Sequence, residues 1–290
     1  MRRLRIMILI FFIAVAGIFA FTTVRERLTS DASAPVITAE SETLTVSVDS
    51  TDEDLLSGMT ATDNLDGDVT GTLTVVSKSK FITKGTLKVN YAAFDENNNV
   101  GVYSREVTYS DYISPRFSIS EPLRFIDGDS NNDYLQNISV DDCLDGNITQ
   151  KIRITFGETT TVDENVSSQS ANLMVTNSAG DNAVLPITLQ FDDYRSYSVQ
   201  APALTDYVMY VKAGTRPDLR SNVAGIWASG RVTEFRDSTA FSLSDVSIND
   251  SDVFYSSPGV YTAVYQLHRQ ERDGSRTRLG SNTLIIVVEE

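Results

Sequence analysis

Two similar stretches decide the fold of this chain: DNLDGDVT at Asp63–Thr70 and, 79 residues later, DCLDGNIT at Asp142–Thr149. Asp-Gly pairs are typical of tight turns, because glycine adopts positive φ without strain and an Asp carboxylate bonds to nearby backbone N–H groups. A turn that recurs in nearly the same letters indicates that the segments around it repeat as well. The two stretches therefore predict tandem copies of one folding unit.

The sequence on both sides of these turns repeats at almost the same spacing. The matching flanks are Ala34–Ile37 with Ser114–Phe117, and Val107–Tyr112 with Leu189–Tyr194. A third segment of similar length follows but lacks the Asp-Gly turn. We therefore expect one module at residues 35–112, a second at 113–195 and a divergent third at 196–290.

Apolar residues alternate with polar ones along each module, as in strands that turn one face to a core and the other to water. Examples are Leu87, Val89, Tyr91 and Ala93 in the first module and Tyr261, Ala263, Tyr265 and Leu267 in the third. The only cysteine, Cys143, leaves no disulfide to staple a module. The fold we expect is all-β: three tandem immunoglobulin-like antiparallel β-sandwiches, held by packing and joined by short linkers.

The first two modules resemble the bacterial immunoglobulin-like domains found in tandem in pesticidal crystal proteins and in many Gram-positive surface proteins. The resemblance rests on Ala34–Ile37 at a module start, the run Asp63–Thr70, and Tyr91–Asp95 before an Asn-rich turn. It covers residues 35–195 well and 205–290 weakly. The second module departs from the family pattern at Cys143, Asn147 and Asn177, and the first at Asn98. The resemblance implies extracellular display, adhesion or spacing rather than catalysis.

The amino terminus carries a membrane signal. Residues 6–24 are uncharged and apolar, and as a helix they rise about 28 Å, close to the thickness of the bilayer core. Arg2, Arg3 and Arg5 precede this stretch, so the positive-inside rule places the short end in the cytoplasm and the body outside. We expect a cytoplasmic tip and single-pass transmembrane signal anchor at residues 1–28 and a spacer at 29–34. The alternative is a secreted protein whose signal is cleaved.

The body is strongly acidic. The whole chain has a formal net charge of −15, with 24 basic and 39 acidic residues, although basic residues dominate the amino terminus. An acidic body repels phosphate backbones, so nucleic acid is excluded as a partner. The third module differs from the other two in charge because it is nearly balanced.

The turn at Asp63–Thr70 offers oxygen ligands for a metal. Asp63, Asp66 and Asp68, with Asp95 nearby, present hard carboxylate oxygens of the kind that calcium binds. Their spacing differs from that of an EF-hand loop. The other interpretation, which we favour, is a turn whose carboxylates bond to local backbone N–H groups.

Two features of the third module are candidates for ligand binding. Arg269, Arg272, Arg276 and Arg278 surround the Asp273-Gly274 turn and form a basic hairpin on an acidic chain, suited to an anionic polymer or an acidic protein face. The alternative is a solvated hairpin with charge pairs to Glu271 and Asp273. Trp227, with Tyr207 and Tyr210, suits a sugar-stacking platform, but a Trp in a sandwich is more often part of the core.

The sequence is poor in catalytic side chains. One Cys and one His exclude a Cys/His zinc site, the lone His268 lies beside Arg269, and an acidic loop disfavours the thiolate of Cys143. We therefore expect no enzyme activity and no cofactor other than calcium. The function we expect is a membrane-anchored extracellular stalk for adhesion, scaffolding or ligand display, with an unknown extracellular protein or glycan as partner. The alternative is a cell-wall or exopolysaccharide accessory factor that binds glycan or assists an enzyme.

Overall fold

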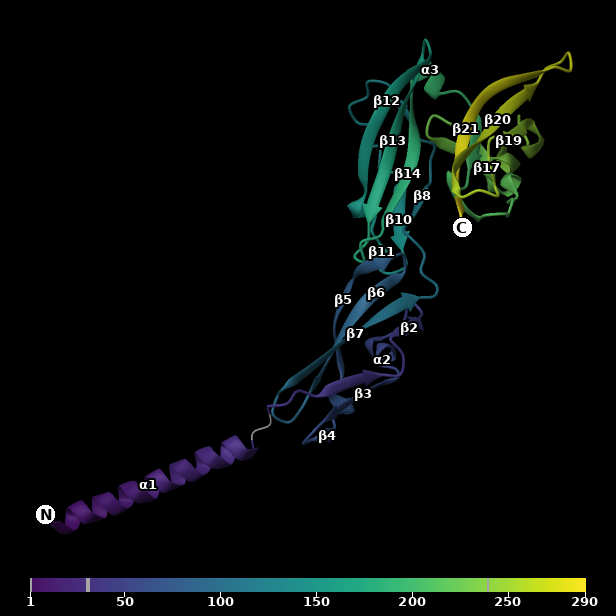
Figure 1. The fold of residues 1–290 in the computed structure, drawn as a ribbon. Helices are drawn as coiled ribbons and strands as arrows, with labels where there is room; N and C mark the ends of the chain where they lie inside the picture. The colour runs from purple at the N-terminus through teal and green to yellow at the C-terminus, as the bar shows by residue number, and fades with distance from the viewer. Residues whose placement is uncertain (1, 30–31, 239) are drawn as a thin grey trace. The chain divides into compact units, whose positions relative to one another are not determined.

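The chain consists mainly of β-strands, preceded by one N-terminal helix (Figure 1). The computed structural model describes residues 2–29, 32–238 and 240–290. The chain divides after Tyr112 into two compact units, the second of which comprises Ile113–Glu290. The strands form six sheets, two for each of three sandwiches, which confirms the all-β fold.

Helix α1 (Arg2–Thr29) contains the apolar stretch Ile6–Val24, none of which is buried within the described part of the chain. The hydroxyls of Thr22 and Thr23, near the end of this stretch, both donate to the carbonyl oxygen of Phe19, at 2.9 and 2.8 Å, so they need no water. The helix is long and apolar enough to cross a membrane. A signal sequence near the amino terminus has the same length and composition, so the helix is compatible with both.

The first sandwich has a sheet of three strands and a sheet of four. The smaller sheet has the order β1 (Val36–Ala39), β3 (Met59–Asp63), β4 (Gly67–Asp68). The larger has the order β2 (Thr43–Val46), β7 (Val100–Tyr109), β6 (Thr86–Phe94), β5 (Thr74–Thr83). Two short helices, α2 (Asp52–Leu55) and η1 (Thr70–Thr72), lie in the connections.

The second sandwich repeats this strand order. Its smaller sheet is β8 (Arg116–Ile119), β10 (Ile138–Asp142), β11 (Gly146–Asn147). Its larger sheet is β9 (Arg124–Ile126), β14 (Asn182–Asp192), β13 (Val166–Thr176), β12 (Arg153–Asp163). Helix η2 (Thr149–Lys151) takes the place of η1.

The third sandwich has the same order again, although its sequence lacks the Asp-Gly turn. Its sheets are β15 (Ala201–Leu204), β17 (Val223–Ala228), β18 (Arg231–Glu234), and β16 (Val208–Lys212), β21 (Arg276–Glu289), β20 (Gly259–Gln270), β19 (Val246–Asn249). Its short helices are α3 (Tyr194–Tyr197), η3 (Leu219–Asn222), η4 (Phe235–Asp237) and η5 (Leu243–Asp245). Ser229 and Gly230, with φ of 51° and 76°, form a two-residue turn between β17 and β18 where the other modules carry the longer loop.

In each sandwich the first strand splits between the two sheets. Its first half (β1, β8 or β15) pairs antiparallel in the smaller sheet, and its second half (β2, β9 or β16) pairs in parallel with the last strand in the larger sheet. The three smaller sheets are therefore antiparallel throughout, whereas each larger sheet contains one parallel pair, which alternation in the sequence does not predict. The short segment between the two halves, at residues 40–42, 120–123 or 205–207, therefore connects the two sheets.

The core of the first sandwich contains a buried arginine. Arg105 lies on the same face of β7 as the buried Val107 and is 2% exposed. Its guanidinium donates to the carbonyl oxygens of Leu55 (2.6 Å) and Ser57 (3.0 Å) and lies 5.6 Å from the ring centroid of Tyr91. These bonds replace water around the charge and tie the segment after α2 to the core.

The second and third sandwiches share one continuous core within the second unit. Figure 1 shows them side by side, in teal and in green to yellow. The N–H of Tyr207 donates to the carbonyl oxygen of Ile119 at 2.8 Å, and the N–H of Ile119 donates to Asp206 at 3.2 Å. The sequence indicated three separate sandwiches with short linkers, whereas here the backbone of β8 bonds to the segment that precedes β16.

Tyr210 and Arg116 extend the same interface. The Tyr210 hydroxyl accepts the N–H of Phe117 at 2.8 Å. Arg116 lies 5.0 Å from the centroid of the Tyr210 ring and forms an ion pair with Glu289 on β21. Each group bridges the second sandwich to the third, so the interface is polar at its edge as well as apolar at its centre.

We predict that Tyr210→Phe changes how the stability of the chain depends on alkaline pH. Burial raises the pKa of Tyr210 to about 12, against a usual value of 10.0. Its contribution is fully present below pH 10 and is lost as the pH rises through about 12, because only the unfolded tyrosine ionises in that range. The variant should lose about 1 kcal/mol near pH 7, since Phe117 N–H loses its acceptor, but should fall less steeply above pH 10.

Urea unfolding of the full chain from pH 7 to pH 11 measures this effect. Tyr194→Phe is the matched control, because the Tyr194 side chain is 77% exposed. Equal alkaline slopes for Tyr210→Phe and wild type would contradict the predicted role of the buried hydroxyl.

Candidate functional site

The aspartate turns are the first candidate site; we define them as Asp63–Asp68 in the first sandwich and Asp142–Asn147 in the second. Asp63 ends β3, and its Oδ1 accepts the N–H groups of Leu65 (2.8 Å) and Asp66 (3.1 Å). Gly67 then has a φ of +74°, which returns the chain into β4. The carboxylate thus holds the turn through residues only two and three positions away.

Three of the four predicted metal ligands lie together. Ligand oxygens of Asp63, Asp66 and Asp95 are within 4.8 Å of one another, and Asp63 and Asp95 are buried. Asp68 is outside this group: its exposed carboxylate accepts the N–H of Thr70 at 3.0 Å. Hydrogen bonds from the side chain and backbone of Thr70 lower the pKa of Asp68.

Protein donors occupy the clustered carboxylates. Asp66 Oδ2 accepts the N–H of Glu96 at 2.8 Å. Asp95 Oδ1 accepts the N–H of Asn99 at 2.7 Å, and Asp95 Oδ2 accepts its side-chain amide at 2.6 Å. These bonds close the turn after β6 onto the aspartate turn. The oxygens are of the type that calcium binds, and they also serve as the framework of two turns.

The second aspartate turn makes the same backbone bonds with fewer charges. Asp142 Oδ1 accepts the N–H groups of Leu144 and Asp145, at 3.0 and 2.9 Å. Asn177 lies where the first module has Asp95, and its side-chain amide donates to Asp142 at 3.1 Å. Both turns share these bonds to the backbone, which supports the interpretation of the carboxylates as the framework of a turn rather than as metal ligands.

Lys151 supplies a positive charge to this second turn. Its Nζ is 2.9 Å from Asp145 Oδ2, which also accepts the N–H of Ser178 at 2.8 Å. Burial acts to raise the pKa of Asp145, but the bonds from Ser178 and Lys151 outweigh it and the pKa is lowered. Asp145 is therefore ionised in the folded protein at neutral pH.

The arginine hairpin, defined as the tip of β20–β21 with Arg269, Arg272, Arg276 and Arg278, is the second candidate. All four side chains are exposed. Among the described side chains none of the four has a salt bridge, so the predicted pairs with Glu271 and Asp273 do not form. Asp273 instead accepts bonds from the N–H and hydroxyl of Ser275, at 2.9 and 2.6 Å.

The strand register places the four guanidinium groups around the hairpin. Arg278 is opposite His268, and Arg276 is opposite Gln270, so these two arginines point to one face of the ribbon. Arg269 is opposite Thr277 and points to the other face, and Arg272 lies at the tip. Of the four, only the side chain of Arg276 has hydrogen bonds to described residues: its guanidinium donates to the side chain of Gln270 (3.3 Å) and to the carbonyl oxygen of Ser244 (3.2 Å).

Trp227, on β17, is buried rather than displayed, with 2% of its surface exposed. The ring packed against it is Tyr197, edge to face at 5.2 Å between centroids. The hydroxyls of the two tyrosines that we expected beside it accept backbone N–H groups instead. Tyr207 accepts the N–H of Leu204 at 3.2 Å, and Tyr210 accepts the N–H of Phe117. The side chains therefore form no exposed stacking platform at Trp227.

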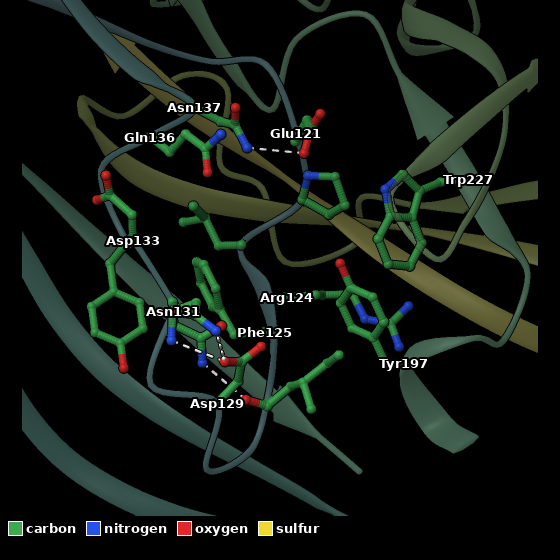
Figure 2. A pocket seen from close by; sticks show the side chains of 15 residues that line it. Glu121, Arg124, Phe125, Asp129, Asn131, Asp133, Gln136, Asn137, Tyr197 and Trp227 are labelled. Atoms are coloured by element: carbon green, nitrogen blue, oxygen red, sulfur yellow. Dashed lines mark hydrogen bonds between the residues drawn. The ribbon is translucent and has the colours of Figure 1, made fainter. Parts of the chain in front are cut away.

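A polar cavity of about 180 Å³ opens beside Trp227 (Figure 2). Segment 121–137 of the second sandwich forms most of its wall, and Tyr197 and Trp227 complete it. Carboxylates and amides dominate the lining, among them Glu121, Asp129 and Asn137. Sequence analysis did not predict this cavity, because its wall is assembled from two modules.

His268 and Cys143 have ordinary surroundings. His268 is half-buried, and its Nδ1 lies 3.5 Å from the hydroxyl of Ser247. Cys143 is exposed in the second aspartate turn, where its Sγ donates to the carbonyl oxygen of Ile113 at 3.0 Å.

No protein-family model and no curated protein sequence matches this chain. Similar solved structures include the CBM51-2 and INT domains of Clostridium perfringens ZmpB in complex with GlcNAc (16% identity, TM-score 0.22), covering 55% of this chain and 41% of that one. Human CDH23 EC21-23 has 15% identity, a TM-score of 0.22 and coverages of 88% and 100%. The lipoprotein BT2262 of Bacteroides thetaiotaomicron has 11% identity, a TM-score of 0.19 and coverages of 87% and 98%.

This chain spans less than half the length of the clostridial chain. TM-scores of this size support no argument about family or function. The fold therefore rests on the strand order of this chain, which is the same in all three sandwiches.

We predict that Gly67→Ala destabilises the first sandwich by about 1–2 kcal/mol. A Cβ at Gly67 would meet nothing within 4 Å, so the cost comes from the φ of +74° alone. Gly71→Ala is the matched control, since Gly71 also has open space and no positive φ. Thermal melting of the full chain compares the two, and equal melting temperatures would show that the turn does not need glycine.

We predict that millimolar calcium and EDTA leave the melting temperature of the first sandwich nearly the same, because the clustered carboxylates already accept protein donors. Asp95→Asn is the comparison variant, since it gives this cluster the Asn found at position 177. A rise of several degrees with calcium in wild type, abolished in Asp95→Asn, would show a bound cation, because a ligand that binds only the native state stabilises it.

Proposed function

We propose that this chain is a non-catalytic extracellular binding protein, and that the arginine hairpin is its recognition surface for an anionic partner. The observation that carries the proposal is that four exposed arginines without salt bridges cluster on a chain whose net charge is −15. Arg116, Arg124 and Arg216, in contrast, are each paired with a carboxylate. The charge of the hairpin is thus left for a partner.

Guanidinium chemistry defines the class of partner. A planar fork of N–H donors matches the two oxygens of a carboxylate, sulfate or phosphate group. Arg276 and Arg278 are two residues apart on one strand, which places them roughly 7 Å from each other. Neighbouring anionic groups of an acidic protein segment or an acidic polysaccharide fit such a row, and attraction of this kind weakens with salt.

We further propose that Ile6–Val24 holds the protein at the membrane and that the first sandwich is a spacer, which lies between this helix and the hairpin along the chain. The three arginines before the apolar stretch support an outward-facing body. The first sandwich is acidic, and its aspartate turn makes bonds within the module, as expected of a spacer. The role that follows is adhesion, scaffolding or ligand display.

A second candidate function is that of a cell-wall or exopolysaccharide accessory factor that binds glycan or assists an enzyme. The polar cavity beside Trp227 favours glycan binding, because each segment of its wall contributes hydrogen-bonding groups.

We predict that the full chain binds immobilised polyglutamate or polygalacturonate, which carry carboxylates on a peptide and a sugar backbone, and that binding weakens as salt increases. The hairpin variant replaces Arg269, Arg272, Arg276 and Arg278 with Ser and should bind at least about tenfold more weakly, since arginines are frequent hot-spot residues. A dodecylphosphocholine micelle keeps the helix soluble.

The matched control replaces Lys80, Lys84, Lys88 and Arg153 with Ser, because these exposed residues carry the same total charge elsewhere. It should bind within about twofold of wild type, as expected for charges far from a contact. Hairpin-variant binding equal to wild type, or equal losses in both variants, would overturn the assignment of recognition to the hairpin.

A further inference from the structure

The polar cavity has charge properties opposite to those of the arginine hairpin. Arg124 lines it, but its Nε and Nη2 are 2.8 and 2.6 Å from Asp192 Oδ2, and Nη2 also donates to the carbonyl oxygen of Ser196 at 2.9 Å. The Arg124 and Asp192 side chains are 8% and 0% exposed, so this ion pair is internal. The cavity therefore offers no free cation to an anionic ligand.

The remaining charged groups of the wall are carboxylates with acceptor capacity to spare. Asp129 Oδ1 accepts the N–H and side-chain amide of Asn131, at 2.9 and 3.0 Å. Asp133 Oδ1 accepts the N–H of Leu135 at 3.0 Å. Glu121 Oε2 accepts the side-chain amide of Asn137 at 2.9 Å. One oxygen of each carboxylate is used by its own loop, and a carboxylate oxygen accepts more than one bond.

Trp227 contributes a donor that the protein leaves unused. Its Nε1 has no hydrogen-bond partner within the described part of the chain, although the residue is 2% exposed. Leaving such a group buried and unpaired is unfavourable, because it has lost its water without gaining another acceptor. Arg124 stacks 5.0 Å from the indole centroid, so the ring is held in place. Figure 2 shows the nitrogen edge of the indole turned toward the side of the cavity where Glu121 lies.

Tyr197 adds a hydroxyl to the same wall. Burial, with the nearby negative charge of Glu121, raises the pKa of Tyr197. The group stays protonated at all physiological pH values and so keeps an O–H donor beside the indole. The wall thus combines acceptors on Glu121, Asp129 and Asp133 with donors on Trp227 and Tyr197.

We propose that the polar cavity binds one uncharged sugar residue. A sugar hydroxyl both donates and accepts, so a ring of hydroxyls satisfies a wall that combines carboxylates on segment 121–137 with N–H and O–H donors on Trp227 and Tyr197. An anion would meet three carboxylates without a free cation, and a protonated amine, which only donates, would leave the N–H of Trp227 and the O–H of Tyr197 without an acceptor. A volume of about 180 Å³ suits one small ring rather than an oligosaccharide. This site is separate from the arginine hairpin and does not depend on it.

The test uses the fact that the chain contains one Trp. Its indole ¹H–¹⁵N group gives a single, assigned NMR signal in the full chain, kept in dodecylphosphocholine, which has no sugar headgroup. The probes are glucose, galactose, mannose and N-acetylglucosamine, with galacturonate and glucosamine as charged counterparts. We expect at least one neutral sugar to shift the indole signal saturably, with a Kd of about 1 mM or weaker, as befits a single small ligand.

Variants locate the binding to this cavity. Glu121→Gln should weaken the sugar response at least fivefold, measured against the variant's own sugar-free indole signal, whereas Glu158→Gln, at an exposed position on β12, should leave the response unchanged. Trp227→Phe keeps an aromatic ring without the N–H and should reduce saturation transfer to the sugar. The hairpin variant should respond like wild type, so failure of the proposed function and failure of this site are distinguishable.

Three results would overturn the proposal. One is an indole signal that no neutral sugar moves at about 100 mM, a concentration that would saturate a millimolar site. Another is a response to galacturonate or glucosamine alone, which would assign a charged ligand to the cavity. The third is a response that Glu121→Gln leaves at full strength, which would place the sugar elsewhere.

Discussion

The first strand of each sandwich crosses from one sheet to the other, and the strand order of the chain depends on this crossing. Each half of the strand satisfies its backbone groups in a different sheet, antiparallel in the smaller and parallel in the larger. The same crossing occurs in all three sandwiches, including the third, whose β17–β18 connection is the Ser229-Gly230 turn. The aspartate turn is therefore one way to close this architecture and not a requirement for it.

The second unit adds a constraint that the first sandwich lacks. Bonds from Ile119 and Phe117 to the segment at Asp206–Tyr210 fasten two sandwiches together, and the internal pair Arg124–Asp192 lies at the same junction. A buried ion pair needs further interactions to replace its lost water. Here the carbonyl oxygen of Ser196 accepts a hydrogen bond from Arg124, and the guanidinium stacks on the ring of Trp227. The cavity is a product of this junction, since its walls come from both sandwiches. The hairpin extends from the same unit, so both candidate binding features belong to residues 113–290.

The charged side chains of this chain differ in whether they have partners within the protein. Buried charges, such as Arg105 and Asp192, are met by carbonyl groups or by an opposite charge. In both aspartate turns the carboxylates accept hydrogen bonds from backbone N–H groups. The second turn also has an ion pair between Lys151 and Asp145. Among the residues that the structure describes, the arginines of the hairpin, in contrast, form no ion pair within the chain. Stability requires no such arrangement, which is why we assign the hairpin to binding.

Four features could be predicted from the order of the amino acids: the repeat, the two-residue periodicity of the strands, the apolar helix and the Asp-Gly turns. All of these depend on residues within a few positions of one another: Asp63 bonds to Leu65 and Asp66, and alternation is set along one strand. Three other features depend on the folded chain: Asp68 stands apart from the cluster of Asp63, Asp66 and Asp95, Tyr207 and Tyr210 bond at an interface, and Trp227 lines a cavity. The reason is physical, because these positions depend on contacts between strands that are 30 to more than 90 residues apart along the chain, and local sequence does not encode which distant strand a side chain meets.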